Sequence, residues 1–488
     1  MTPSTIEIAL ISHTNAGKTT LARTLLGRDI GEVRDAPHVT DVSESHPLMS
    51  SAEGDVLRLT DTPGFGDSAR LVQRLRVADN PLGWLLREVW DRYRDRPFWC
   101  SQQAVRAARD GADVVLYLVN AAEDPGDAGY VALEMQVLRW VGKPVIVLLN
   151  QVGPPRDAED ERRDIERWRA HLAPHGIVND VLAFDAFARC WVQERVLLDA
   201  VAAALPAEGR AALARLKEAW ERVSVERFHA SMRVLAAELG IAARDAEPVG
   251  GEAATTAQKL LRSVGVGRRD ADPGRERAMA LLAGRLDVAI RDATDRLIAL
   301  HGLEGSATQA VLERMQEHFA VPAQVDEGRA ALLGSIVTGA LTGLKADLAA
   351  GGLTFGAGML VGGVVGGLAG AGLARGVNVL RGAEHPAVRW SEDFLDGLVL
   401  SGVLRYLAVA HFGRGRGRYV EGEAPPFWKG EVEQALAGQR DALHALWQDA
   451  RGGHDDVDVR LAALMAAVTA QALARLYPGR VPAPLLAR

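Results

Sequence analysis

The sequence is poor in cysteine, poor in aromatic residues and has no surplus of positive charge. Only Cys100 and Cys190 occur in 488 residues, which is too few for a disulfide framework or a cysteine-based metal site and favours a reducing compartment. The net charge is −7, and no strongly basic segment stands out, although a dedicated nucleic-acid-binding protein usually carries one. Nucleic acid is therefore not an expected partner.

The amino-terminal residues also lack the features of an export signal. The first ten residues, MTPSTIEIAL, have no basic start, and no cleavage site follows them. We therefore expect a cytoplasmic protein. With 48% hydrophobic and 24% charged residues, the chain is expected to fold into about two to four domains with a large core.

Residues 1–205 alternate short apolar runs with helical patterns, which predicts an α/β domain with a mostly parallel sheet. A helical insertion is expected at about 67–110, where tryptophans lie among arginines. The insertion is interpreted either as a helical pair packed on the domain or as a surface for a protein partner or a homodimer. The expected strands are 6–11, 56–59, 114–119, 145–149 and 181–184.

From about residue 206 the strand patterns stop and helical periodicity takes over. The remaining chain is predicted to be all-α, in three parts. They are a helical region over 206–325, a glycine-rich helical hairpin over 326–380 and a C-terminal helical region over 381–488.

A phosphate-binding pattern follows the first expected strand. Residues 12–19 are S-H-T-N-A-G-K-T, which matches the Walker A pattern G-x-x-x-x-G-K-[ST] except that Ser12 replaces the first glycine. In that pattern, backbone N–H groups and a helix N-terminus hold phosphate oxygens. Lys18 is expected to contact the β- and γ-phosphates. The alternative, an ordinary Gly-Lys-Thr turn, is disfavoured by the strand before it and the helix after it. The predicted nucleotide-binding residues here are His13, Thr14, Asn15, Ala16, Gly17, Lys18, Thr19 and Thr20.

A second motif, D-T-P-G at 61–64, ends the expected strand 56–59. In P-loop GTPases, D-x-x-G supplies an Asp that acts on Mg²⁺ through water and a Gly N–H that contacts the γ-phosphate. Thr40, in the polar loop between the two motifs, is a candidate switch threonine. The predicted catalytic residues are Lys18, Thr40, Asp61 and Gly64, and the predicted Mg²⁺ ligands are Thr19, Thr40 and Asp61.

The order of these motifs resembles the translation-factor-related GTPases, in the branch that includes Era and TrmE. The whole chain also resembles a bacterial family that joins such a domain to a glycine-rich helical C-terminal domain of unknown function. This resemblance implies a switch that binds and hydrolyses GTP with Mg²⁺. Because TrmE-like proteins bind K⁺ with an asparagine where Asn15 stands, it also implies hydrolysis stimulated by K⁺, the alternative being a plain loop asparagine. The segments that carry the second resemblance are FDAFARCWVQE, LKADLAAGGLTFGAGMLVGGVVGGLAGAGLARG and LRYLAVAHFGRGRGRY.

Two positions depart from the GTPase pattern. Phe65 follows D-T-P-G where Ras-like proteins carry a water-positioning glutamine, so intrinsic hydrolysis is expected to be slow or to need a group from an ion, a partner or a dimer. The guanine-reading motif N-K-x-D appears as N-Q-V-G at 150–153, and Gly153 cannot accept hydrogen bonds from guanine. An ATPase, or a nucleotide-binding scaffold with little hydrolysis, therefore stays open as an alternative. The residues predicted near the base are Asn150, Gln151, Asp185 and Ala186.

The glycine-rich segment carries no charged residue between 348 and 374, and its glycines recur every four residues. Rows of small residues allow helices to pack closely, and the length is sufficient to span a bilayer. However, Lys345 and Asp347 would lie at the tip of the hairpin, where their transfer across a membrane is costly. Two interpretations stay open. The hairpin at 326–380 either associates with the membrane, as a peripheral contact at the inner membrane, or packs as a glycine zipper inside a soluble helical domain.

Overall fold

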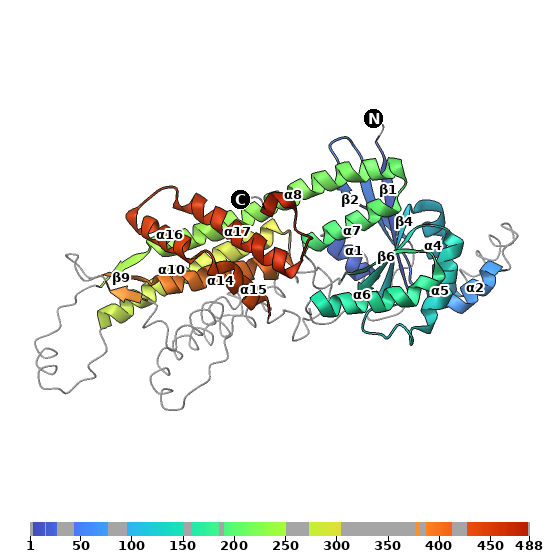
Figure 1. Ribbon diagram of the computed structural model, residues 1–488, viewed down its shortest axis with the longest axis horizontal. Coiled ribbons are helices and arrows are strands. Elements are labelled where there is room, and N and C mark those ends of the chain that lie inside the picture. Colours follow the sequence, from blue (N-terminus) through green and yellow to red (C-terminus); the bar gives the residue numbers. More distant parts are fainter. Residues whose placement is uncertain are drawn as a thin grey trace, which may run out of the picture. The chain divides into compact units, whose positions relative to one another are not determined.

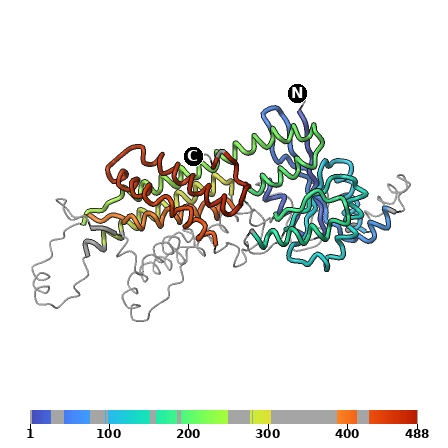
Figure 2. The backbone as a smooth tube through the Cα atoms, viewed as in Figure 1, coloured from blue at the N-terminus to red at the C-terminus, as the bar shows by residue number. Residues whose placement is uncertain are grey.

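A computed structural model of the chain describes ten segments. They are residues 3–14, 16–26, 43–76, 95–150, 158–184, 190–249, 273–303, 377–379, 387–411 and 427–486. The chain divides into two compact units (Figures 1 and 2). The first comprises Met1–Glu226, Ala410–Pro425 and Leu476–Pro482, and the second comprises Arg227–Val409, Pro426–Arg475 and Ala483–Arg488.

The first unit is built on a six-stranded sheet with the order β2-β3-β1-β4-β5-β6. Every neighbouring pair is parallel except β2 and β3, which are antiparallel. The predicted α/β domain with a mostly parallel sheet is therefore confirmed. The strands are β1 (Thr5–Ser12), β2 (Glu44–Ser50), β3 (Val56–Asp61), β4 (Val114–Asn120), β5 (Val145–Asn150) and β6 (Val178–Ala183).

Helices cover both faces of this sheet (Figure 1), which explains why β5 is buried along its whole length. Against one face pack α1 (Lys18–Leu26), α7 (Trp191–Ala204) and the beginning of α8 (Ala207–Arg244). Against the other face pack α2 (Ser68–Arg76), α4 (Arg96–Gly111), α5 (Gly129–Val141) and α6 (Ala158–Leu172), which the short helix η1 (Ala173–His175) follows.

The edge strand β2 was not among the expected strands. Its sequence, ESHPLMS, shows no apolar alternation and contains Pro47, which lacks a backbone N–H and normally argues against a strand. The proline is tolerated because β2 lies at the end of the strand order, and the pairing with β3 shifts register between Pro47 and Met49.

The second unit consists mainly of helices that are distant in the sequence but lie side by side. In Figure 2 the green and yellow segments of α8 and α10 run beside the orange and red segments of α14 and α17. Arg405 on α14 contacts Glu238 on α8 and the Ile290 carbonyl on α10, and Thr469 on α17 contacts Met232 on α8. The helices that follow α8 are α10 (Pro273–Leu300), α14 (Glu392–Ala410), α15 (Phe427–Ala437), α16 (Arg440–Gly452), α17 (Val457–Leu476) and α18 (Ala483–Leu486).

The prediction of an all-α region after residue 206 is wrong in one respect. A three-stranded antiparallel sheet with the order β7-β9-β8 joins β7 (Ala246–Pro248), β9 (Ala387–Trp390) and β8 (Val377–Val379). Residues 387–390 had been expected in a helix. Strands of three or four residues are too short to show the alternation by which a strand is recognised. The C-terminal region is therefore largely helical, with a small sheet.

The predicted glycine-rich hairpin at 326–380 lies outside the described residues, apart from β8. Within the described ranges, α17 is the one helix long and apolar enough to cross a bilayer by length and composition alone. Its residues Leu461, Met465 and Val468 are fully buried in the structure, whereas Val459 is 73% exposed.

Candidate nucleotide-binding site

The phosphate loop connects β1 to α1 at the carboxyl edge of the sheet, where parallel strands usually place a ligand site. Gly17 has a φ of +85°, a left-handed backbone conformation that residues other than glycine rarely adopt. Helix α1 begins at Lys18, and the Leu21 N–H donates to the Gly17 carbonyl at 2.9 Å. The amino end of a helix thus lies at the loop, which is the arrangement that binds phosphate.

Lys18 is buried in this loop, and its Nζ donates to Ser12 Oγ at 2.8 Å. Burial lowers the pKa of Lys18 to about 8, while the negative charges of Asp61 and Glu134 act in the opposite direction. Ser12 is therefore more than a small replacement for the usual glycine, because its hydroxyl holds the lysine. A buried lysine held by a hydroxyl, with no ion pair among the described residues, is well suited to receive a polyphosphate.

Thr19 and Asp61, two of the predicted Mg²⁺ ligands, lie in contact. Thr19 Oγ1 donates to Asp61 Oδ2 at 2.7 Å. Asp61 is 3% exposed, and among the described residues its Oδ1 has no hydrogen-bond partner. Burial raises the pKa of Asp61, and the Thr19 hydrogen bond and the Lys18 charge oppose this. A buried carboxylate oxygen with spare acceptor capacity beside a hydroxyl fits the oxygen ligands that Mg²⁺ takes, directly or through water.

The D-T-P-G-F segment lies directly on the phosphate loop. The Phe65 N–H donates to the Ser12 carbonyl at 2.9 Å, and the Thr14 N–H donates to the Phe65 carbonyl at 3.2 Å. The Thr14 hydroxyl donates to the same carbonyl at 2.9 Å. A Cβ atom on Gly64 would lie 3.0 Å from Thr14 Cα and 3.1 Å from Lys18 Nζ, so any larger residue would press on the phosphate loop.

The Phe65 side chain belongs to the hydrophobic core and is fully buried. It shares that core with Leu71 and Val72 of α2 and with Phe98 of α4. A buried phenyl ring has no group that positions water. Slow intrinsic hydrolysis stays a prediction.

Asn150 at the end of β5 is also fully buried, and its Nδ2 donates to the Ala16 carbonyl at 2.8 Å. It was predicted near the base. The structure shows that it fixes the phosphate loop to the sheet, and a contact with a base stays a prediction.

The structure thus brings together most of the predicted site. Ser12, Thr14, Ala16, Gly17, Lys18 and Thr19 are joined with Asp61, Gly64 and Asn150 by the contacts above. Thr20 is buried in the first turn of α1. The predictions for Asn15, Thr40, Gln151, Asp185 and Ala186 fall outside the described residues and stay predictions.

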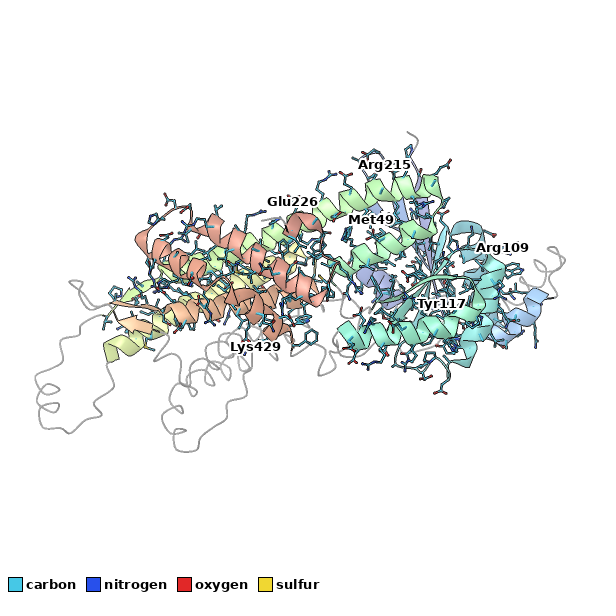
Figure 3. The ribbon with its side chains drawn as sticks, viewed as in Figure 1. Met49, Arg109, Tyr117, Arg215, Glu226 and Lys429 are labelled. Atoms are coloured by element: carbon cyan, nitrogen blue, oxygen red, sulfur yellow. The ribbon has the colours of Figure 1, made fainter. Side chains whose placement is uncertain are left out.

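Glu134 on α5 is the site residue that sequence analysis missed. Its side chain is fully buried, and His13 Nδ1 and Ser68 Oγ both lie 2.7 Å from its Oε1. The hydroxyl of Tyr117, labelled in Figure 3, donates to its Oε2. A signal was available, because Glu134 falls between Val131 and Leu138 on the buried face of α5, where an apolar residue is usual.

Comparison with known proteins gives two family matches. Residues 7–151 match the family described as 50S ribosome-binding GTPase, and residues 170–461 match a domain of unknown function, DUF3482. The first match covers the phosphate loop, the D-T-P-G segment and Asn150. The second covers more than half of the chain.

Individual relatives agree with the first match. GTPase Der of Xanthomonas axonopodis pv. citri (strain 306) is 27% identical over 278 residues, which cover 54% of this chain and 50% of Der. GTPase Der of Myxococcus xanthus (strain DK1622) is 29% identical over 150 residues, covering 30% of this chain and 26% of that protein. The chain spans about half the length, or less, of these curated relatives. A crystal structure of Era in complex with MgGDPNP and a segment of 16S ribosomal RNA aligns with 42% of this chain and 58% of Era, at 17% identity and a TM-score of 0.31.

Proposed function

The chain belongs to the DUF3482 family and carries an Era/Der-like GTPase domain, and from this premise we propose that it is a Mg²⁺-dependent GTP switch. Membership of the P-loop GTPase family implies GTP binding and hydrolysis. The proposal adds that this chain's own site is competent. The observation that carries it is the Thr19–Asp61 pair. Asp61 Oδ1 has no hydrogen-bond partner among the described residues and is buried in the same site as Lys18.

In this proposal the phosphates of GTP lie on the loop at the amino end of α1. The charge of Lys18 is directed to the β- and γ-phosphates, and its bond to Ser12 is exchanged for bonds to phosphate oxygens. Thr19 and Asp61 hold Mg²⁺, which neutralises charge on the phosphates. Asn150 keeps the loop in place through the Ala16 carbonyl.

The switch element is the Gly64–Phe65 segment. In the structure its backbone pairs with Ser12 and Thr14. We propose that the Gly64 N–H binds the γ-phosphate after this pairing opens, and that hydrolysis allows it to form again. Because Phe65 cannot position water, the proposal includes slow turnover that is assisted by K⁺ at Asn15, by a partner or by a second copy.

The remaining chain is proposed to be the part that responds to the nucleotide. Residues 1–205 would form the switch, and 206–325, 326–380 and 381–488 the helical parts that move, dock or contact the inner membrane. The lack of charge between 348 and 374 supports membrane contact through the hairpin.

The test is phosphate release by the purified full chain with GTP and with ATP, in K⁺ and in Na⁺. Lys18→Ala should lower turnover by about 100-fold or more, because it removes the buried cation of the loop. Lys143→Ala is the matched control, since Lys143 precedes β5 at the opposite edge of the sheet. It should turn over like the unmodified chain.

Each outcome has a clear meaning. GTP turnover that is faster in K⁺ and lost in Lys18→Ala supports the proposed switch. Equal turnover of ATP contradicts the guanine preference and favours the ATPase alternative. If nucleotide binds but no turnover occurs in either salt, the chain's own site is not competent alone, and the chain is either a nucleotide-binding scaffold or an enzyme that requires its partner.

A further inference from the structure

We propose that Glu134 is a positioning residue that holds the Gly64–Phe65 segment closed on the phosphate loop and thereby opposes the binding of a third phosphate. The inference rests on the proposed GTP switch. It concerns a buried acid that the nucleotide-binding motifs do not include.

Glu134 is the meeting point of three donors. A carboxylate can only accept hydrogen bonds, so His13 Nδ1, Ser68 Oγ and Tyr117 OH all donate to it, the first two at 2.7 Å. Its side chain is fully buried. A buried carboxylate is costly unless its acceptors are satisfied, and these three donors satisfy both oxygens of Glu134.

The three donors come from parts of the site with different freedom to move. Tyr117 lies on β4, which is paired on both sides within the sheet. His13 belongs to the phosphate loop, and its ring is also stacked on Tyr130 with centroids 4.4 Å apart. Ser68 begins α2, only three residues after Phe65. Glu134 therefore ties the beginning of α2 to the fixed side of the site.

The closed arrangement and a bound γ-phosphate compete for the same place. Gly64 lies so close to Lys18 that a Cβ added to Gly64 would lie 3.1 Å from Lys18 Nζ. The Phe65 carbonyl accepts hydrogen bonds from both the N–H and the hydroxyl of Thr14. A phosphate oxygen that reaches Lys18 from this side requires Gly64 to move. Because Ser68 follows so soon, that movement strains or breaks its bond to Glu134.

The inference predicts an effect on GTP that GDP does not share. Without the Ser68–Glu134 bond, the closed arrangement is less stable, so a γ-phosphate displaces it more easily. The affinity ratio is the affinity for a non-hydrolysable GTP analogue divided by the affinity for GDP. In Ser68→Ala this ratio should rise about tenfold, which is the size expected for the loss of a hydrogen bond to a charged group. Glu134→Gln should shift the ratio in the same direction.

Tyr117→Phe is the matched control. It also removes one hydroxyl donor from Glu134, but the donor lies on the sheet and not on the moving segment. The affinity ratio of Tyr117→Phe should stay within about twofold of that of the unmodified chain. Ser68→Thr keeps a hydroxyl at position 68 and should have the affinity ratio of the unmodified chain. Both affinities are measured by titration of the full chain with fluorescent GDP and the fluorescent analogue, with thermal melts as a check of folding.

The outcomes separate this inference from the proposed function. If the unmodified chain binds neither nucleotide, the proposed switch fails before any variant is compared. If it binds both, and Ser68→Ala leaves or lowers the ratio, only the role of Glu134 is overturned. A Tyr117→Phe shift as large as that of Ser68→Ala also overturns it, because it shows a general loss of packing. Should Glu134→Gln not fold, the serine variants still decide.

Discussion

Two buried acids, one in each unit, differ in how their oxygens are paired. In the first unit Asp61 is buried with one carboxylate oxygen lacking a protein partner among the described residues. In the second unit Glu238 is equally buried, but both its oxygens accept bonds from Arg405 Nη2, at 2.5 and 2.7 Å. A buried acid with spare acceptor capacity indicates a ligand site, whereas one whose acceptors are used indicates a structural role.

The largest effect is expected at Glu238, where both oxygens of the acid are paired. Glu238→Gln leaves Arg405 as an uncompensated buried charge, and breaking such a pair costs about 3–5 kcal/mol. The free energy of unfolding from urea titration should fall by that amount, while GDP affinity of the folded protein stays within about twofold. A stability like that of the unmodified chain would contradict a structural role for this pair.

Asp61→Asn should lower activity rather than stability, the reverse of what is expected for Glu238→Gln. Mg²⁺-dependent GTP turnover is expected to fall about 100- to 1,000-fold, because the charged ligand is lost. Stability at neutral pH should stay the same or rise, since burial raises the pKa of Asp61 and thus disfavours its charged form in the fold. Phosphate release and urea titration measure the two effects. A loss of stability as large as that of Glu238→Gln would contradict the distinction between these two acids.

Asp55 shows that the first unit also contains a fully paired acid. It is buried and accepts bonds from Arg215 Nε and Nη2 at 2.7 and 2.8 Å, and Figure 3 labels Arg215 on α8. These bonds hold the pKa of Asp55 well below its usual range.

A depressed pKa in the fold means that the stabilisation is present above the unfolded pKa, about 3.9, and is lost as the pH falls through the folded value. Asp55→Asn should therefore be less stable at neutral pH and lose less stability on acidification below about pH 4. Urea midpoints measured across this range test the sign. Parallel profiles for the two proteins would show that Asp55 contributes nothing to acid sensitivity.

The smallest effect is expected at Ser12, whose hydroxyl holds Lys18 before nucleotide binds. Ser12→Gly restores the usual glycine and frees the lysine, so GDP affinity should rise about threefold, within the net value of a single hydrogen bond. Fluorescent GDP titration measures it, with Ser4→Gly, just before β1, as a control. A fall in affinity would mean that the hydroxyl serves the bound state.

Much of this site could be predicted because its phosphate-binding and Mg²⁺-binding residues lie in short sequence motifs. The spacing of Lys18, Thr19 and Asp61 after apolar strands was sufficient to place them together. Glu134 could not be placed in the same way, because it lies 121 residues from His13 and no local spacing encodes that contact. The strands likewise divide into those that local sequence predicts and those that it does not. Long apolar strands such as β4 were predicted, whereas β2 and the strands of the small sheet were not, since their pairing depends on distant partners.

The burial of Phe65 has an evolutionary consequence. Its backbone lies on the phosphate loop while its ring is packed with Leu71, Val72 and Phe98. If this segment is the proposed switch, those core positions serve both stability and the opening of the segment. Changes there that leave the protein folded should then alter nucleotide exchange, and this part of the core should diverge more slowly among related sequences than the opposite face of the sheet.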